Sequence, residues 1–521
     1  MQLFTDAPAR LMPPLPRDAL ASAAAARRAP DTGHTFTPAV DERTLDVFRR
    51  ARDPADPREL RDLWLGRIEH EQGRHATRPQ LAEHWRASAH RRDVTTEELL
   101  SSRTTVAFVH ELHQGFPHEE AGDAGTPGPR LSLLPGPADA CATHLPRTVR
   151  DCMRYALRRD WYGYSDSCGR VPAREALAAY ENRRVHGARY TGRNVALTVN
   201  APFAVSGLAD HLLSGRPASG APALCAVPNR PTTVQAVARR ADIRLVPLTC
   251  ADGTMSVAPL LAALRPDTPL VFLPTVACTT GARVAEDELA LLIRAAPPST
   301  VILLDESDEW LGGTAPLSAA RAAPHVVRVS GFPHTWQPQV LDAAWIVADS
   351  ALVADYYEYA STSFGGPPSL LYTTVEVVAR MERWLAEGTD RVGPAETGEF
   401  ETTYGLTRAR LQHAYDRYRL ERRSQETTLT TLRDAAVHRL SRTAGVRVHT
   451  PRCSVDLLVE TARPYDSYRL CGELLRETGV AAHPPLLDFC LAGGGLRITT
   501  AKQWPRLTAA LSRLRPFLEV P

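Results

Sequence analysis

The stretch of this sequence richest in chemistry is Val301–Asp308, four apolar residues followed by Asp305, Glu306, Ser307 and Asp308. An apolar run of this length predicts a buried strand of a parallel sheet. Ligands of open α/β sheets bind just beyond the carboxyl ends of such strands. The sequence therefore predicts that the carboxylates of Asp305 and Asp308 face a site.

A second stretch, Val329–Trp336, is predicted to be the next strand and the loop that leaves it, and it carries Ser330 and His334. A histidine beside two carboxylates is a plausible acid–base set, because an aspartate can orient the imidazole. We therefore predict His334, Asp305 and Asp308 as the catalytic group. The alternative for His334 is a structural histidine in a loop, and the sequence does not separate the two.

Composition describes an ordinary globular protein of 521 residues, with 44% hydrophobic and 23% charged residues, long enough for two or three domains. A net charge of +2 gives no general attraction to nucleic acid or membrane. The nine cysteines lack metal-ligand or disulfide spacing, which predicts a cytoplasmic protein without a metal site. No apolar run approaches the roughly 20 residues that cross a bilayer.

Domain organisation follows from shifts in composition along the chain. Residues 1–40 are rich in proline, alanine and threonine and are expected to form a flexible arm. Residues 41–120 have apolar residues at helical spacing and are expected to be a helical extension. A linker precedes a large domain at 130–372, and a smaller C-terminal domain is expected at 373–521.

From Arg130 onward, spaced motifs resemble the fold type I, pyridoxal-phosphate-dependent aminotransferases of class I/II. The matching motifs are Ala173–Leu177, Thr280-Gly281, the Asp305 strand and Leu496-Arg497-Ile498. The resemblance implies an α/β fold with a mainly parallel seven-stranded sheet in the large domain and an α+β small domain. It also implies a homodimer.

The resemblance assigns roles to five residues. Asp305 matches the acid that pairs with the pyridine nitrogen, and Cys278 stands where an asparagine contacts the ring oxygen. Ala201 lies at the start of the helix that holds the cofactor phosphate, and Ser330 lies in the loop that carries the cofactor lysine. Arg497 matches the arginine that binds the substrate carboxylate.

The sequence departs from the family where the cofactor is tethered. The lysine position falls on His334, or on Pro333 if the register is shifted by one residue, and Asp308 replaces a tyrosine. The chain holds one lysine, Lys502, far from that loop and expected at the solvated surface. We therefore expect either no cofactor or pyridoxal or pyridoxamine phosphate held without a covalent bond.

Three functions remain open at this point. The first is a biosynthetic enzyme acting on an amino-acid-like or carboxylate substrate without an internal aldimine. The second is a partner subunit that pairs with a lysine-bearing paralogue. The third is a MocR-like regulator, because Ser101–Val106 resembles the recognition helix of a GntR-type winged helix; a helical cap or dimer arm is the favoured interpretation of that segment. The enzyme is preferred because Asp305 and Arg497 are retained.

Overall fold

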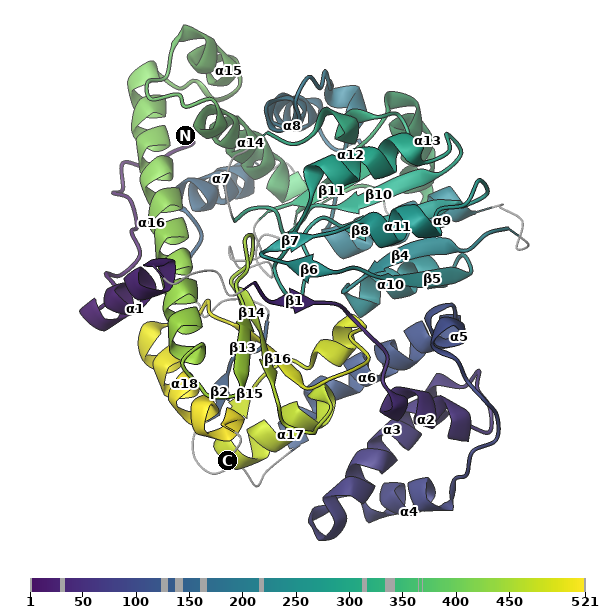
Figure 1. Cartoon of the computed structure of the whole chain (residues 1–521). Helices are drawn as coiled ribbons and strands as arrows, with labels where there is room; N and C mark the ends of the chain where they lie inside the picture. Colours follow the sequence, from purple (N-terminus) through teal and green to yellow (C-terminus); the bar gives the residue numbers. More distant parts are fainter. Residues whose placement is uncertain are drawn as a thin grey trace.

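The computed structural model describes residues 2–28, 33–122, 130–135, 144–159, 166–214, 220–311, 316–332, 343–363, 365–367 and 369–519, without the side chains of 117–122 and 402. Within these ranges the chain forms a large α/β domain, a smaller C-terminal domain and a group of N-terminal helices (Figure 1). None of the helices described combines the length and apolarity needed to cross a membrane.

The large domain is organised around a seven-stranded sheet. Its order is β3-β12-β11-β10-β8-β4-β5. β12 pairs antiparallel with β11 and β3, and the other pairs are parallel. The strands are β3 Val195–Thr198, β4 Ala223–Val227, β5 Ile243–Pro247, β8 Leu270–Pro274, β10 Val301–Asp305, β11 Val326–Gly331 and β12 Ala344–Val347. The predicted, mainly parallel seven-stranded sheet is confirmed.

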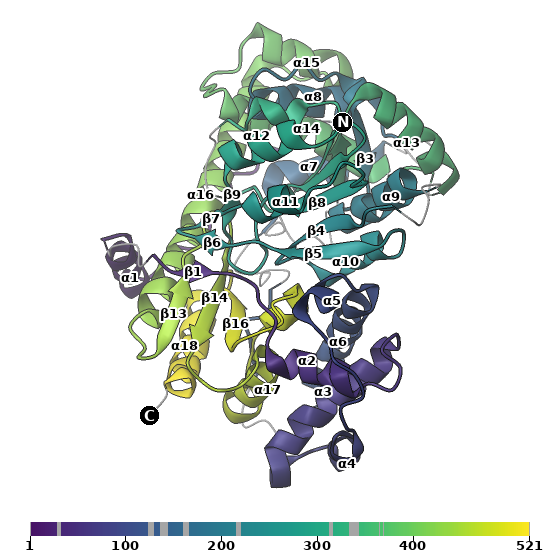
Figure 2. The same cartoon turned by 45° about the vertical axis from the view of Figure 1, so that its right-hand side comes forward.

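Helices cover both faces of this sheet, which explains why its strands are apolar throughout. Helices α9 and α10 pack on one face, and α11 and α12 pack on the other. Figure 2 shows the N-terminal helices α5 and α6 below the edge strand β5. The bounds are α8 Val171–Arg184, α9 Ala201–Leu213, α10 Pro231–Ala238, α11 Ala258–Ala263, α12 Glu286–Ala295, α13 Ser350–Ser363 and α14 Tyr372–Ala386. Successive residues of β10 alternate between the two cores: Leu303 packs with α9 and α10, and Ile302 and Leu304 pack with α12.

The small domain contains an antiparallel sheet, β13-β14-β16, covered by two helices. Helix α16, Arg408–Leu440, is about 50 Å long and runs from the large domain to the small one. The other elements are α15 Pro394–Tyr404, β13 Val446–His449, β14 Asp456–Thr461, α17 Ser467–Thr478, β15 Val480–Ala481, η6 Pro485–Asp488, β16 Gly495–Thr499 and α18 Trp504–Leu518.

The expected domain bounds differ from the structure at two places. β2, Leu131–Ser132, pairs with β15, so the residues just after 130 belong with the small domain. Helix α14 packs against α8, so the residues just after 372 belong with the large domain. Neither pairing involves neighbouring residues of the chain, so shifts in composition do not reveal it.

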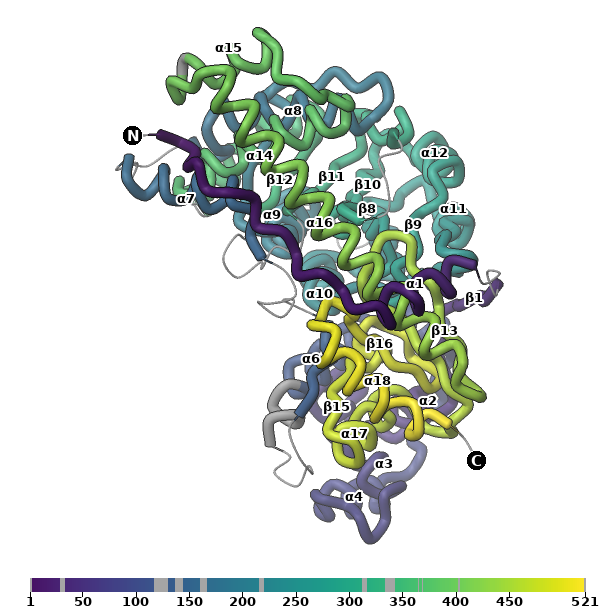
Figure 3. The backbone as a smooth tube through the Cα atoms, turned by 90° about the vertical axis from the view of Figure 1, so that its left-hand side faces the viewer, coloured from purple at the N-terminus to yellow at the C-terminus, as the bar shows by residue number. Residues whose placement is uncertain are grey.

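The N-terminal segment is packed against the molecule, contrary to the expectation of a flexible arm. Figure 3 shows it running beside α16. Leu3 and Phe4 are buried, and Arg417 of α16 donates to the carbonyls of Thr5 and Ala7 at 2.9 and 3.0 Å. Helix α1, Arg17–Arg28, lies on α16. A few scattered apolar residues, among them Leu3, Phe4 and Met12, and backbone carbonyls attach this segment to the molecule, and such scattered residues form no pattern in a proline-rich sequence.

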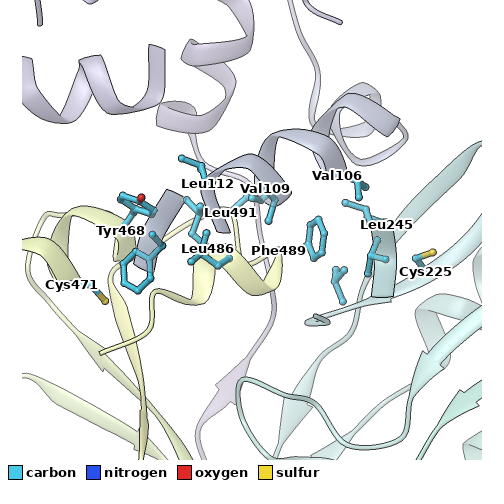
Figure 4. Packing of buried hydrophobic residues seen from close by; sticks show 14 of the residues in the cluster. Val106, Val109, Leu112, Cys225, Leu245, Tyr468, Cys471, Leu486, Phe489 and Leu491 are labelled. Carbon is cyan, nitrogen blue, oxygen red and sulfur yellow. The ribbon is translucent and has the colours of Figure 1, made fainter. Parts of the chain in front are cut away.

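Residues 42–122 form α2 Glu42–Arg50, α3 Pro57–Gln72, α4 Pro79–Ala87, α5 Thr96–Leu100 and α6 Arg103–Gly122. Thr95 caps α5 by accepting from the N–H of Glu98. Helix α6 lies between the two domains (Figure 4), with Val106 near Leu245 of β5 and Val109 near Phe489 of the small domain. The apolar face of this segment is thus buried inside the molecule, which argues against a DNA-reading helix.

Candidate functional site

A cavity of about 350 Å³ lies at the carboxyl ends of β8 and β10, between the large and small domains. Its charged and imidazole-bearing lining residues, among those the structure describes, are His113, Arg230, Asp308, Asp456, His483, Asp488 and Arg497. A larger cavity of about 630 Å³ lies among α8, α14 and α16, and Trp310 lines both. The described residues predicted for the site do not line the larger one, so the candidate site is the cavity at the strand ends.

On the large-domain side, Asp305, Asp308 and Cys278 surround the side chain of Arg230. Arg230 Nη2 donates to both carboxylate oxygens of Asp308, at 2.9 and 2.7 Å. Burial raises the pKa of Asp305, and the nearby Arg230 guanidinium partly opposes that rise. Asp305 Oδ1 also accepts from the N–H of Ser307 at 3.0 Å. The structure therefore brings the two predicted aspartates together, with an arginine between them that the sequence did not identify.

On the small-domain side, Arg497 is held by two aspartates. Its Nη2 donates to Asp456 Oδ2 at 2.9 Å, and its Nη1 donates to Asp488 Oδ2 at 3.1 Å. Asp488 also accepts from the hydroxyl of Thr279 at 3.0 Å. Although burial opposes ionisation, Arg497 and His483 hold the pKa of Asp488 well below its usual range. The arginine predicted to bind a substrate carboxylate thus already has two carboxylate partners within the chain.

Two histidines meet at this side of the cavity. His483 Nε2 lies 3.3 Å from Asp488 Oδ1, and the His113 ring lies 6.5 Å from the His483 ring, centre to centre. His113 comes from α6, where Phe116, three residues on, also packs against His483. Burial lowers the pKa of His113, and the neighbouring His483 lowers it further.

Sequence reasoning missed both histidines, together with Arg230, Asp456 and Asp488. The one available signal was that His113 and Phe116 share a face of a predicted helix. That signal does not say where the helix docks.

Cys278 lines the cavity beside Thr279. It is buried, and burial raises the pKa of its thiol well above the usual range, with Asp488 adding to the rise. The thiol is therefore neutral at pH 7. A neutral thiol is a weak nucleophile, so Cys278 shapes the cavity rather than attacking a ligand.

Three predicted residues lie elsewhere. Ala201 is buried at the first turn of α9, and Ser330 hydrogen-bonds with Glu306 and Arg184 on the opposite face of the sheet. Neither lines the cavity. His334 lies outside the described residues, so its role stays a prediction.

The single lysine is buried, which corrects the expectation of a solvated surface position. Lys502 is 7% exposed. Arg497, Thr499 and Ala501, every second residue of one stretch, line the cavity, and Lys502 is not among the described lining residues.

Pyridoxal phosphate needs backbone donors for its phosphate and side chains around its ring. At the start of α9, Asn200 Oδ1 takes the N–H of Phe203 at 2.8 Å, and Pro202 has none to offer. At the ring position, the cation beside Asp305 is Arg230, which also engages Asp308. A pyridinium ring would compete with this guanidinium for the same acid. These residues do not fit the cofactor.

Comparison with known proteins gives a match in structure alone. No protein-family profile matches the chain, and no curated protein matches it. Solved structures of aminotransferases are similar to this chain in fold. A tetra mutant of the Thermus thermophilus aspartate aminotransferase has a TM-score of 0.59 and 21% identity, covering 75% of this chain and 97% of its own.

Two further structures are similar to the same degree. The aspartate aminotransferase of Rhizobium meliloti has a TM-score of 0.61 and 16% identity, covering 78% of this chain and 96% of its own. The aromatic aminotransferase of Pyrococcus horikoshii has a TM-score of 0.59 and 16% identity, covering 75% of this chain and 95% of its own. This chain has the fold of the fold type I, pyridoxal-phosphate-dependent aminotransferases.

Proposed function

We propose that this chain is a small-molecule enzyme that keeps the aminotransferase fold and acts on an amine or an amino-acid-like substrate without an internal aldimine. Its side chains alone carry out the acid–base chemistry. The observation that supports this proposal best is the pairing of His483 with Asp488 at the wall of a cavity at the strand ends.

His483 and His113 are the proposed proton-transfer groups. Asp488 is buried, and its lowered pKa keeps it ionised, so it orients the His483 imidazole. His113 has a lowered pKa, so it is neutral at pH 7 and accepts a proton. Two neighbouring imidazoles that line the cavity can transfer protons to and from a bound molecule.

The large-domain side of the cavity is proposed to hold the substrate in place. Asp308 is about one quarter exposed and points its carboxylate at Arg230, so a ligand can share this pair. His334 follows β11, the neighbour of β10 in the sheet, and we keep it in the proposal as a third acid–base group.

The regulator and partner-subunit alternatives have less support. The segment resembling a recognition helix is α6, whose apolar face is buried between the domains. A subunit that only supports a partner has no need of a buried His–Asp pair beside a cavity. A homodimer remains part of the proposal and is checked by the mass of the protein in solution.

The test is turnover by the purified full chain without added cofactor. A panel of amines and amino acids in deuterium oxide, followed by NMR, reports chemical conversion and proton exchange. We expect conversion of at least one panel member and a loss of about 100-fold or more in His483→Ala.

The matched control is His186→Ala, because His186 is an exposed histidine that does not line the cavity. It should retain wild-type rates. Turnover that needs added pyridoxal phosphate would contradict the proposal. Turnover that is as fast in His483→Ala as in the control His186→Ala would also contradict it.

A further inference from the structure

Both arginines of the candidate site are already neutralised by aspartates of the chain. Arg230 donates twice to Asp308, at 2.9 and 2.7 Å. Arg497 donates to Asp456 at 2.9 Å and to Asp488 at 3.1 Å. An arginine that awaits a ligand carboxylate would instead present its paired N–H groups to the cavity.

Carboxylates outnumber guanidinium groups in the described lining. Two arginines, Arg230 and Arg497, face three aspartates, Asp308, Asp456 and Asp488. The thiols of Cys278 and Cys453 are also neutral, because burial raises the pKa of each. The buried carboxyl of Asp305 lies near Arg230, and whether neutral or ionised it cannot offset the carboxylates of the lining. The cavity therefore has one more carboxylate than it has guanidinium groups.

Asp456 has an oxygen left for a ligand. Both of its bonds to Arg497 use Oδ2, at 2.9 and 3.2 Å. Among the donors in the described part of the chain, none reaches Oδ1. The Asp456 side chain is about one tenth exposed, and the residue lines the cavity. A carboxylate oxygen at the wall of a partly buried cavity favours an ammonium donor.

A carboxylate ligand meets the opposite situation. To reach Arg497 it would have to displace Asp456 or Asp488, or lie beside both. Like charges a few ångströms apart repel strongly in a partly buried site. We infer that the cavity takes a cationic amine without a carboxylate group, and that Asp456 and Asp308 are its acidic partners.

This inference names the substrate class of the proposed enzyme, and it rests on the proposed function only for the statement that the ligand is then transformed. Binding and turnover are measured separately. An amine that binds without being converted would contradict the enzyme proposal but would still support the inference about binding.

The test is calorimetric titration of the full chain with three probes of equal length: 1,5-diaminopentane, 5-aminopentanoate and glutarate. We expect the diamine to bind and glutarate not to bind, with 5-aminopentanoate between them. Added salt should weaken the binding of the diamine, because that binding is electrostatic. Glutarate binding more tightly than the diamine, or no binding of the diamine, would overturn the inference.

Substitutions of the two acidic partners test which carboxylate holds the amine. Asp456→Asn removes one acidic partner and loosens the hold on Arg497, so diamine affinity should fall about tenfold or more while glutarate gains. Asp308→Asn, at a more exposed carboxylate, should also weaken diamine binding and let glutarate gain, because Arg230 loses the carboxylate to which it donates. The control is Asp390→Asn, an 81% exposed aspartate on Arg419, which should change neither. Equal effects of Asp456→Asn and Asp390→Asn would contradict the inference.

Discussion

The two sides of strand β10 carry ion pairs of different kinds. On the side of α9 and α10, Asp305 and Asp308 meet Arg230 next to a cavity. On the opposite side, Glu306 accepts from Arg328 Nε and Nη2 at 2.8 and 2.6 Å and from Arg321 Nη1 at 2.5 Å. All three residues of that second cluster are at most 1% exposed.

The buried Glu306 cluster has a structural role, whereas the Asp305 and Arg497 clusters, only a few residues away, lie at the candidate site. The Glu306 cluster joins the core under α12 to the core under α8 and α14, through Glu181 and Arg184 of α8. Glu306, Arg321 and Arg328 line neither of the two cavities described above. The Asp305 and Arg497 clusters instead face an opening, where their charges can be shared with a small molecule. Substitutions in the closed cluster should therefore cost stability, and those in the open clusters should change binding.

The largest effect is expected in the closed cluster. Glu306→Gln leaves Arg321 and Arg328 buried beside a neutral amide, so the free energy of unfolding should fall by about 3–5 kcal/mol. Urea denaturation followed by tryptophan fluorescence measures the loss. The control is Glu387→Gln, a 38% exposed partner of Arg383, expected within about 1 kcal/mol of wild type. An equal fall in the free energy of unfolding in the two variants would contradict the structural role assigned to the Glu306 cluster.

An intermediate effect is expected at Asp488, which belongs to the open side yet is itself buried. Asp488→Asn should cost about 2 kcal/mol, since Arg497 keeps Asp456 as a partner. The folded-state pKa of Asp488 is depressed, so its contribution is present above the unfolded pKa near 4 and is lost as the pH falls below it.

Unfolding curves at a series of pH values measure this contribution. The wild type should lose stability between about pH 4 and pH 2 more steeply than Asp488→Asn does. Parallel curves for the two proteins would show that Asp488 is not held ionised by Arg497 and His483.

The smallest effect on stability is expected at Arg230, whose pair with Asp308 is about one quarter exposed. Arg230→Ala should cost about 1 kcal/mol or less. It should also raise the pKa of Asp305 further, because Arg230 opposes the effect of burial there. Carbon-13 NMR of aspartate carboxyls in the wild type and the variant detects this shift. Arg419→Ala, at an exposed pair with Asp390, should leave the Asp305 signal unchanged.

The fold could be predicted because its signals are local and repeated. The apolar runs that became β8 and β10 are buried strands, and the alternation within them decides which side each carboxylate takes. Arg497 was found for the same reason, since Leu496-Arg497-Ile498 is a recognisable strand and became part of β16.

The partners of these residues could not be predicted. Asp456 and Asp488 meet Arg497 from a strand and a short helical turn elsewhere in the small domain, and His113 arrives on a helix from the N-terminal extension. Single polar residues have no periodic pattern. Which of them converge depends on how domains dock, and the docking surfaces, such as the apolar face of α6, become identifiable only in three dimensions.

The central claim is that the chain keeps the aminotransferase fold but not its cofactor site. The most direct measurement is the absorption spectrum of the purified full chain titrated with pyridoxal phosphate, for the wild type and Lys502→Ala. The account predicts the spectrum of free cofactor in both proteins, because Arg230 already occupies the cationic position beside Asp305 and, of the first three residues of α9, Pro202 has no N–H and the N–H of Phe203 is taken by Asn200. A visible aldimine band in the wild type that disappears in Lys502→Ala would contradict it.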